Sequence, residues 1–136
     1  MIGKQTKGTS FSGCVCYVLR EYKSKLLEAI GVEGTPEQMA EQFELQTLLN
    51  DKVKNTVGHT SLNFSPEDGE RLHHDDALML QIAHDYMEKM GIADTQYVVA
   101  RHTDREHPHC HIVFDRVNND GKTISDKNDF YRNEKV

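Results

Sequence analysis

The sequence lacks any hydrophobic run close to the roughly 20 residues that a membrane-spanning helix needs, and its N-terminus lacks the apolar core of a signal peptide. It has only three cysteines, Cys14, Cys16 and Cys110, and no CxxC pair. An odd number of cysteines at this spacing argues against a disulfide framework and fits a reducing compartment. We therefore expect a soluble protein of the cytoplasm without a membrane segment.

Internal repeats, low-complexity segments and linkers are also missing. The length of 136 residues lies near the commonest domain size, and 37% hydrophobic with 28% charged residues is ordinary for a soluble globular protein. We expect a single domain over residues 1–136. Because the last residues read as the start of a helix with no stop signal, we expect this domain to be an N-terminal fragment of a longer protein.

Positive charge is scarce, because 16 lysines and arginines stand against 22 aspartates and glutamates, for a formal net charge of -6. Proteins that bind nucleic acid usually present a basic face that displaces counterions from the phosphates. The overall charge therefore counts against a nucleic-acid binder. A bound divalent cation, a local basic stretch or a basic C-terminal part beyond residue 136 would offset it.

The spacing of apolar residues and the turn residues predict alternating strands and helices. We expect an α+β fold in which a central, mainly antiparallel sheet carries helices packed on one face. Residues 66–69 read as a turn, and residues 25–32 fit either a short strand or an extension of the first helix. The expected strands span residues 1–6, 57–65, 95–102, 109–117 and 122–124; the expected helices span residues 9–22 or 9–23, 35–50, 75–90 and 126 onward.

Two histidines are predicted to lie side by side on one strand. Side chains at positions i and i+2 of a strand share a face, so His109 and His111 point one way and Cys110 the other. His102, at the end of the preceding strand, can join them if the two strands are neighbours. Three neutral imidazoles leave coordination positions open for water and substrate, as in a catalytic metal site.

Such a pair of histidines often occurs without a metal. Here four of the eight histidines fall within residues 102–111, together with two acidic residues, and this density favours a metal site. Asp104 is a candidate to fix the tautomer of a ligand histidine or to accept a proton from a nucleophile, and its alternative is a solvated turn residue. Glu106 and His107 read as loop residues. We expect nothing convergent around three further histidines, His73, His74 and His84.

A second polar strand face lies upstream. His59, Ser61 and Asn63 alternate in the strand expected at residues 57–65 and therefore share one face. If this strand is central, its polar face points the same way as the histidine pair. The three residues are then candidates for phosphate or base contacts. The alternative is a polar face exposed to solvent.

Three stretches resemble the motifs of a known family. The sequence RHTDREHPHCHIVFDRV, residues 101–117, resembles the third motif of relaxases of the MobA/VirD type, which belong to the histidine-hydrophobe-histidine endonuclease superfamily. MIGKQTKGTSFSGCVCYVLRE resembles their first motif and VGHTSLNFSPED their second, and NNDGKTISDKNDFYRNEKV is similar to the segment that comes after the third motif in such domains. The three motifs occur in the family's order and together are more specific than one pair of histidines.

The resemblance implies a relaxase-like palm with a histidine triad at the centre of its sheet. It implies that His102, His109 and His111 bind a divalent metal and that Tyr17 attacks a phosphodiester of single-stranded DNA at a transfer origin. The enzyme would act in the bacterial cytoplasm with accessory mobilization proteins. Magnesium or manganese is the expected metal in use, although imidazole ligands also suit zinc or nickel, which a crystal could contain.

Helical periodicity separates two tyrosines near the N-terminus. At 100° per residue, Tyr22 falls about 20° from Phe11, in the middle of the apolar stripe, whereas Tyr17 falls about 120° away, at its border. We therefore predict that Tyr22 lies in the core and that Tyr17 can reach a ligand. Without the resemblance, Tyr17 would read as a boundary tyrosine packed against the sheet.

Two other functions remain open. A replication-initiator nuclease of the same superfamily would share the histidines, but its tyrosine usually follows them, and Tyr131 is the only tyrosine after them here. A non-enzymatic protein-binding module would keep the histidines as a structural or incidental metal site.

Overall fold

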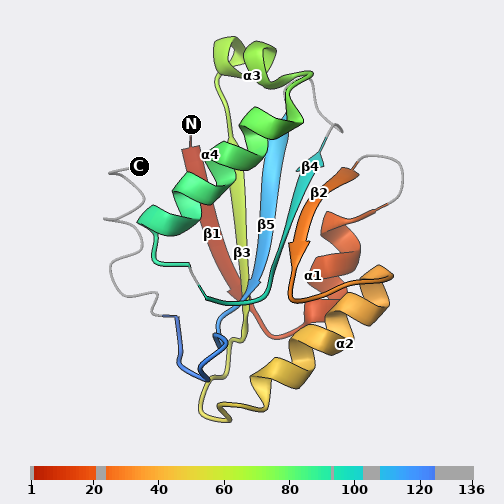
Figure 1. Ribbon diagram of the computed structural model, residues 1–136, viewed down its shortest axis with the longest axis vertical. Coiled ribbons are helices and arrows are strands. Elements are labelled where there is room, and N and C mark those ends of the chain that lie inside the picture. Colours follow the sequence, from red (N-terminus) through yellow and green to blue (C-terminus); the bar gives the residue numbers. More distant parts are fainter. Residues whose placement is uncertain (1, 21–23, 93, 103–107, 125–136) are drawn as a thin grey trace.

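The computed structural model describes residues 2–20, 24–92, 94–102 and 108–124. Its centre is a five-stranded sheet in the order β1-β3-β5-β4-β2, in which every neighbouring pair is antiparallel (Figure 1). This order places β3, β5 and β4 inside the sheet and leaves β1 and β2 as its edges. The strands are β1 (Ile2–Gly8), β2 (Ser24–Ile30), β3 (Val57–Asn63), β4 (Tyr97–His102) and β5 (His109–Asp115).

Four helices connect and cover the strands: α1 (Phe11–Val18), α2 (Pro36–Thr47), α3 (Pro66–Leu72) and α4 (Asp76–Lys89). Each begins after a residue whose side-chain oxygen accepts a hydrogen bond from a backbone N–H of the first turn. These N-cap residues are Ser10, Thr35, Ser65 and Asp75.

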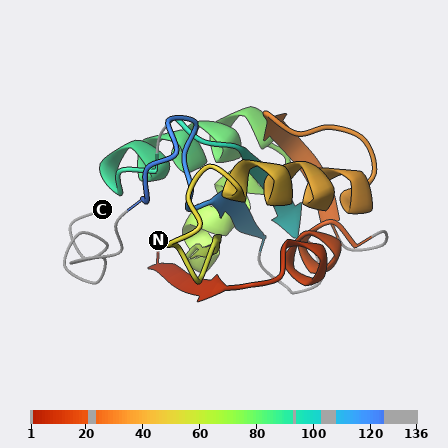
Figure 2. The same cartoon turned by 90° about the horizontal axis from the view of Figure 1, so that it is seen from below.

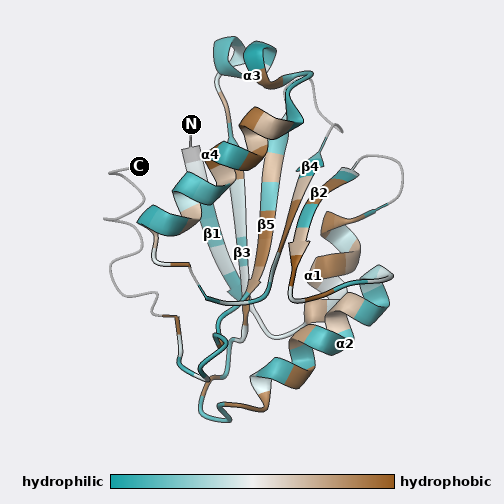
Figure 3. Cartoon of the chain, in the orientation of Figure 1, coloured by the Kyte–Doolittle hydropathy of each residue, from teal (hydrophilic) through white to brown (hydrophobic). Residues whose placement is uncertain are grey.

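Helices cover both faces of the sheet, so the expectation of one covered face is wrong. The strand β5 is buried along its whole length, so both of its sides are covered. Its residues Ile112 and Phe114 pack in a core with α4, whereas Val113 packs in a second core with α1 and α2. Figure 2, seen from below, shows α4 and α1 on opposite sides of the sheet. Figure 3 shows hydrophobic residues along β4, β5 and α1.

The α+β class and the antiparallel sheet are confirmed, and residues 25–32 form the strand β2 rather than more helix. The first helix ends earlier than expected, with Leu19 as its C-cap. The expected strand at residues 122–124 is only an isolated bridge between Val117 and Thr123. The expected core residue Tyr22, the C-terminal helix and Tyr131 lie outside the described residues.

The expected turn at residues 66–69 is instead the start of α3. Ser65 caps the helix, Pro66 occupies the first helical position and acidic residues follow in the first turn. The same pattern of N-cap, proline and acidic first turn correctly predicted the start of α2 at Thr35 and Pro36. The start of α3 could therefore also have been predicted from the sequence. No helix in the described part of the chain is long and apolar enough to cross a membrane.

Candidate functional site

The strand register brings the predicted site residues onto one face of the sheet. On β5, His111 lies opposite Ser61 of β3 and Ala100 of β4. His109 lies opposite Asn63 on one side and His102 on the other. Because directly opposed residues share a face, the neighbouring strands place these polar side chains together. This face also packs against α1 and α2.

His102, His109 and His111 form a compact cluster. Ring centroids lie 3.9 Å apart for His102 and His111, 5.7 Å for His109 and His111, and 6.1 Å for His102 and His109. The exposed fractions of the three residues are 0%, 6% and 5%, respectively. From the sequence, His102 was expected to join His109 and His111 only if their strands were neighbours. The pairing of β4 with β5 meets this condition.

The ring of His102 is anchored to the end of α1. Its Nε2 lies 2.7 Å from the carbonyl oxygen of Val18, the last residue of the helix. A carbonyl only accepts, so Nε2 must be the protonated nitrogen, and in a neutral ring Nδ1 then keeps the lone pair. The contact also satisfies one of the carbonyls that a helix C-terminus leaves without an intrahelical partner.

His59 contacts the cluster directly. Its Nε2 lies 2.8 Å from Nδ1 of His111, and the two rings stack with centroids 5.0 Å apart. Burial, and then the electrostatic effect of the neighbouring His102, lower the pKa of His59. His59 is therefore a neutral, half-buried imidazole with one nitrogen already engaged by His111.

Tyr17 lies over the cluster from the C-terminal turn of α1. Its ring centroid is 5.9 Å from that of His102, 6.1 Å from His111 and 6.3 Å from His59. The side chain is 48% exposed, because the buried residues of α1 hold the opposite side of the helix against the sheet. The guanidinium carbon of Arg20 lies 5.0 Å from the Tyr17 ring centroid, a cation–π contact.

A cavity of about 420 Å³ opens beside these residues. Two of its lining residues, Lys4 and Thr6 of β1, were not predicted from the sequence. They lie opposite Ser61 and His59 in the pairing of β1 with β3. Alternation along β1 could have shown that they share a face, but only the strand order shows which face. The lining comprises Lys4, Thr6, Tyr17, His59, Ser61, Asn63, His109 and His111.

The described residues fit a divalent metal by chemistry but are not set in coordination geometry. No group of three histidine, cysteine, aspartate or glutamate side chains among them is arranged to hold an ion in this structure. The donors nevertheless suit a first-row metal, because His102 and His111 each have one ring nitrogen fixed by a neighbour, as metal ligands usually do. Asp104, Glu106 and His107 lie outside the described residues.

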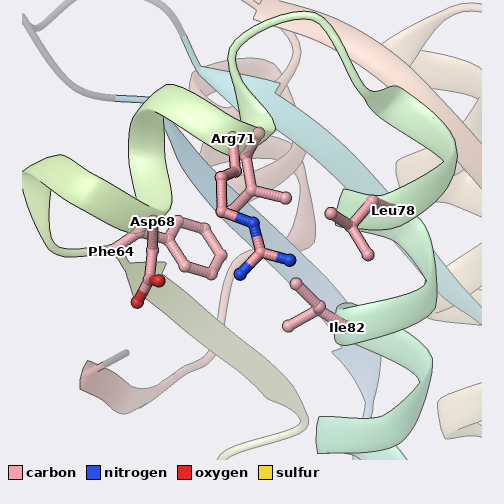
Figure 4. A pocket seen from close by; sticks show the side chains of 6 residues that line it. Phe64, Asp68, Arg71, Leu78 and Ile82 are labelled. Carbon is pink, nitrogen blue, oxygen red and sulfur yellow. The ribbon is translucent and has the colours of Figure 1, made fainter.

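A second cavity, of about 190 Å³, lies between α3 and α4 on the other face of the sheet (Figure 4). The Arg71 guanidinium extends between the Phe64 ring and the Leu78 and Ile82 side chains. This lining is mostly apolar, and the described residues there offer no nucleophile with a base and no set of metal ligands. The histidine face is therefore the candidate site.

The structure corrects the expectation for His84. Its Nε2 lies 2.8 Å from a carboxylate oxygen of Glu28, and the hydroxyl of Tyr97 donates to the same oxygen. Burial alone would raise the pKa of Glu28, but these two hydrogen bonds lower it. The three residues come from α4, β2 and β4, and they tie α4 to the sheet.

The fold and the site together define an α+β domain whose inner strands present a histidine cluster beside an exposed tyrosine. The family model "Relaxase: MobA/VirD2-like, nuclease domain" matches residues 17–136. The chain therefore belongs to the MobA/VirD2-like relaxase nuclease-domain family. The matched span begins at Tyr17 and includes all four clustered histidines, and membership implies endonuclease activity on DNA. No match to the chain was found among the curated proteins.

Proposed function

We propose that this domain is a metal-dependent relaxase that nicks single-stranded DNA at a transfer origin during mobilization or conjugation. The main support is the position of Tyr17, whose half-exposed ring lies about 6 Å from three histidine rings and lines the same cavity. A nucleophile beside a metal-binding set, of which His109 and His111 line the same cavity, suits phosphodiester transfer. The domain would act in the bacterial cytoplasm with accessory mobilization proteins.

In this proposal the hydroxyl oxygen of Tyr17 attacks the scissile phosphorus. The bond from phosphorus to the 3′ oxygen breaks as the bond to Tyr17 forms, which leaves a 5′-phosphotyrosine and a free 3′-hydroxyl. A phenol is protonated at neutral pH, so Asp104 or a histidine must accept its proton, and the leaving oxygen takes up a proton. Because a phosphodiester is exchanged for a phosphodiester, the step is reversible and permits rejoining.

His102, His109 and His111 would hold the divalent metal, magnesium or manganese in use. When bound, the metal supplies positive charge for the scissile phosphate as negative charge develops. The arrangement of Val18 and His59 around this triad keeps two of its rings oriented. Arg20 would place a second positive charge over the Tyr17 ring as the phenol loses its proton.

The polar residues of β1 and β3 would hold the DNA strand. Ser61, Asn63 and Thr6 offer hydroxyl and amide groups to phosphates and bases, and Lys4 adds a positive charge. Such contacts would let this cavity bind DNA although the formal net charge of the chain is -6.

The covalent intermediate provides the test. The full chain is incubated with a labelled oligonucleotide that carries the origin strand of its own mobile element, with manganese or magnesium, and the products are separated on a denaturing gel. We expect a covalent adduct with the native protein, none with Tyr17→Phe, and none with either protein in chelator-treated buffer. The Tyr17→Phe protein should still bind the metal, because phenylalanine leaves the three histidines in place.

An adduct formed by Tyr17→Phe would refute the assignment of the nucleophile. If peptide mapping placed that adduct on Tyr131, the nucleophile would follow the histidines in the chain, as it usually does in a replication-initiator nuclease. A native protein that binds metal but forms no adduct with its origin strand would favour the non-enzymatic module.

A further inference from the structure

We infer that His59 is a positioning residue for His111: it accepts a hydrogen bond from Nδ1 of His111 and so directs Nε2 of His111 to the metal. The inference rests on the proposed metal site. It gives His59 a role different from the phosphate or base contact expected from the sequence, because Nε2 of His59 already faces His111 at 2.8 Å.

The sheet fixes both members of this pair. His111 lies opposite Ser61, and His59, two residues from Ser61 on β3, lies opposite Val113. The two histidines are thus diagonal neighbours on one face, a distance that long side chains can span. Their rings stack with an interplanar angle of 26°, so the contact is made between two oriented rings.

The direction of this hydrogen bond decides whether His111 can bind a metal. A neutral imidazole has one protonated and one unprotonated nitrogen. If Nδ1 of His111 donates to His59, Nε2 keeps its lone pair and can bind a metal. If His59 donates instead, the proton of His111 lies on Nε2 and blocks coordination there.

His102 offers a parallel within the same cluster. Its Nε2 donates to the Val18 carbonyl, which leaves Nδ1 as the possible ligand atom. Metal-binding histidines usually donate their second nitrogen to a carbonyl, a carboxylate or water. In this protein His59 would supply the acceptor for His111, and it does so with an imidazole in place of an oxygen.

The test compares two substitutions in the full chain without DNA. The side-chain carbonyl of His59→Gln can accept the hydrogen bond, whereas His59→Leu fills similar space without an acceptor. We expect the manganese dissociation constant of His59→Leu to rise about 10–100-fold, the effect typical of losing such an outer partner, and that of His59→Gln to stay within a few-fold of native. Calorimetric titration with manganese measures both.

His84→Leu is the matched control, because it removes a half-buried, hydrogen-bonded histidine from the opposite face. It should leave the manganese affinity unchanged. Thermal unfolding without metal confirms that each variant is folded. A His59→Leu protein that is folded and binds manganese like the native chain would overturn the role of His59.

Nitrogen chemical shifts of His111 in the metal-free native protein give a second readout. We expect a protonated Nδ1 and an unprotonated Nε2; the reverse tautomer overturns the inference even if the leucine variant fails to fold. Should the native chain bind no manganese, the proposed metal site fails, and the tautomer alone then decides whether His59 orients His111.

Discussion

Asp115 is a fully buried carboxyl group at the end of β5. Burial raises its pKa to about 7, although a hydrogen bond from the Val117 N–H acts in the opposite direction. Its Oδ2 has no hydrogen-bond partner among the residues that the structure describes. The ionised form is therefore poorly accommodated, and the folded protein holds a proton there that the unfolded chain releases at lower pH.

This pKa gives stability a defined pH dependence. Between the ordinary value of 3.8 and about 7 the folded state binds more protons than the unfolded state, so the free energy of unfolding falls as pH rises through this range. The difference corresponds to at most about 4 kcal/mol. We expect Asp115→Asn to raise the melting temperature by several degrees at pH 8 and to lose this advantage toward pH 4.

Thermal unfolding across this pH range measures the effect. Asp51→Asn, at an exposed position, is the control and should follow the native curve. Parallel curves for Asp115→Asn and the native protein would contradict the prediction.

At the scale of elements, α4 is attached to the sheet by a polar contact at its first residue. Nε of Arg101, which is 4% exposed on β4, donates to Asp76 at 2.7 Å, and Lys25 of β2 binds the other carboxylate oxygen. Hydrogen bonds from Lys25 and Arg101 lower the pKa of Asp76. This contribution to stability is present above the ordinary carboxyl pKa and is lost as pH falls, opposite in sign to that of Asp115.

We expect Asp76→Ala to destabilise the fold, because it leaves the Arg101 charge buried without its carboxylate. Loss of one partner from a fully buried pair costs about 3–5 kcal/mol, and the partial exposure of Asp76 reduces this to about 1–3 kcal/mol. Urea unfolding gives the value. Asp85→Ala, on the exposed side of the same helix, should change it little, and equal losses for both variants would refute the role of the contact.

Features that depend on the spacing of residues within one helix or strand could be predicted from the sequence, whereas features that depend on the pairing of distant strands could not. The exposure of Tyr17 followed from helical periodicity, and the shared face of His109 and His111 followed from strand alternation. Lys4 and Thr6 joined the cavity through the pairing of β1 with β3, which no local pattern encodes.

The contact of His84 with Glu28 and Tyr97 was missed for the same physical reason. Its members come from three elements that are distant in the sequence. The covering of both sheet faces could have been predicted, because the consecutive apolar residues Ile112, Val113 and Phe114 alternate between the two faces of β5. The roles of Tyr17 and of the three metal ligands remain predictions.

On the scale of the whole molecule, an acidic chain must bind a polyanion through few positive groups. Lys4 lines the cavity and Arg20 lies over Tyr17, whereas the formal net charge is -6. Each phosphate contact to a single strand contributes about -0.7 to the slope of log K against log salt concentration. We therefore expect a shallow slope for origin-strand binding, and we expect Lys4→Ala to reduce its magnitude by about 0.7.

Fluorescence anisotropy of a labelled origin strand, titrated at several salt concentrations in the presence of manganese, measures this slope. Lys52→Ala removes the same charge at an exposed position outside the cavity lining, so it separates the loss of a phosphate contact from the general change in net charge. Both variants make the chain equally more acidic. If both variants reduce the slope equally, the DNA responds only to the overall charge of the protein. A reduction confined to Lys4→Ala places a phosphate beside β1, the edge strand that pairs with β3.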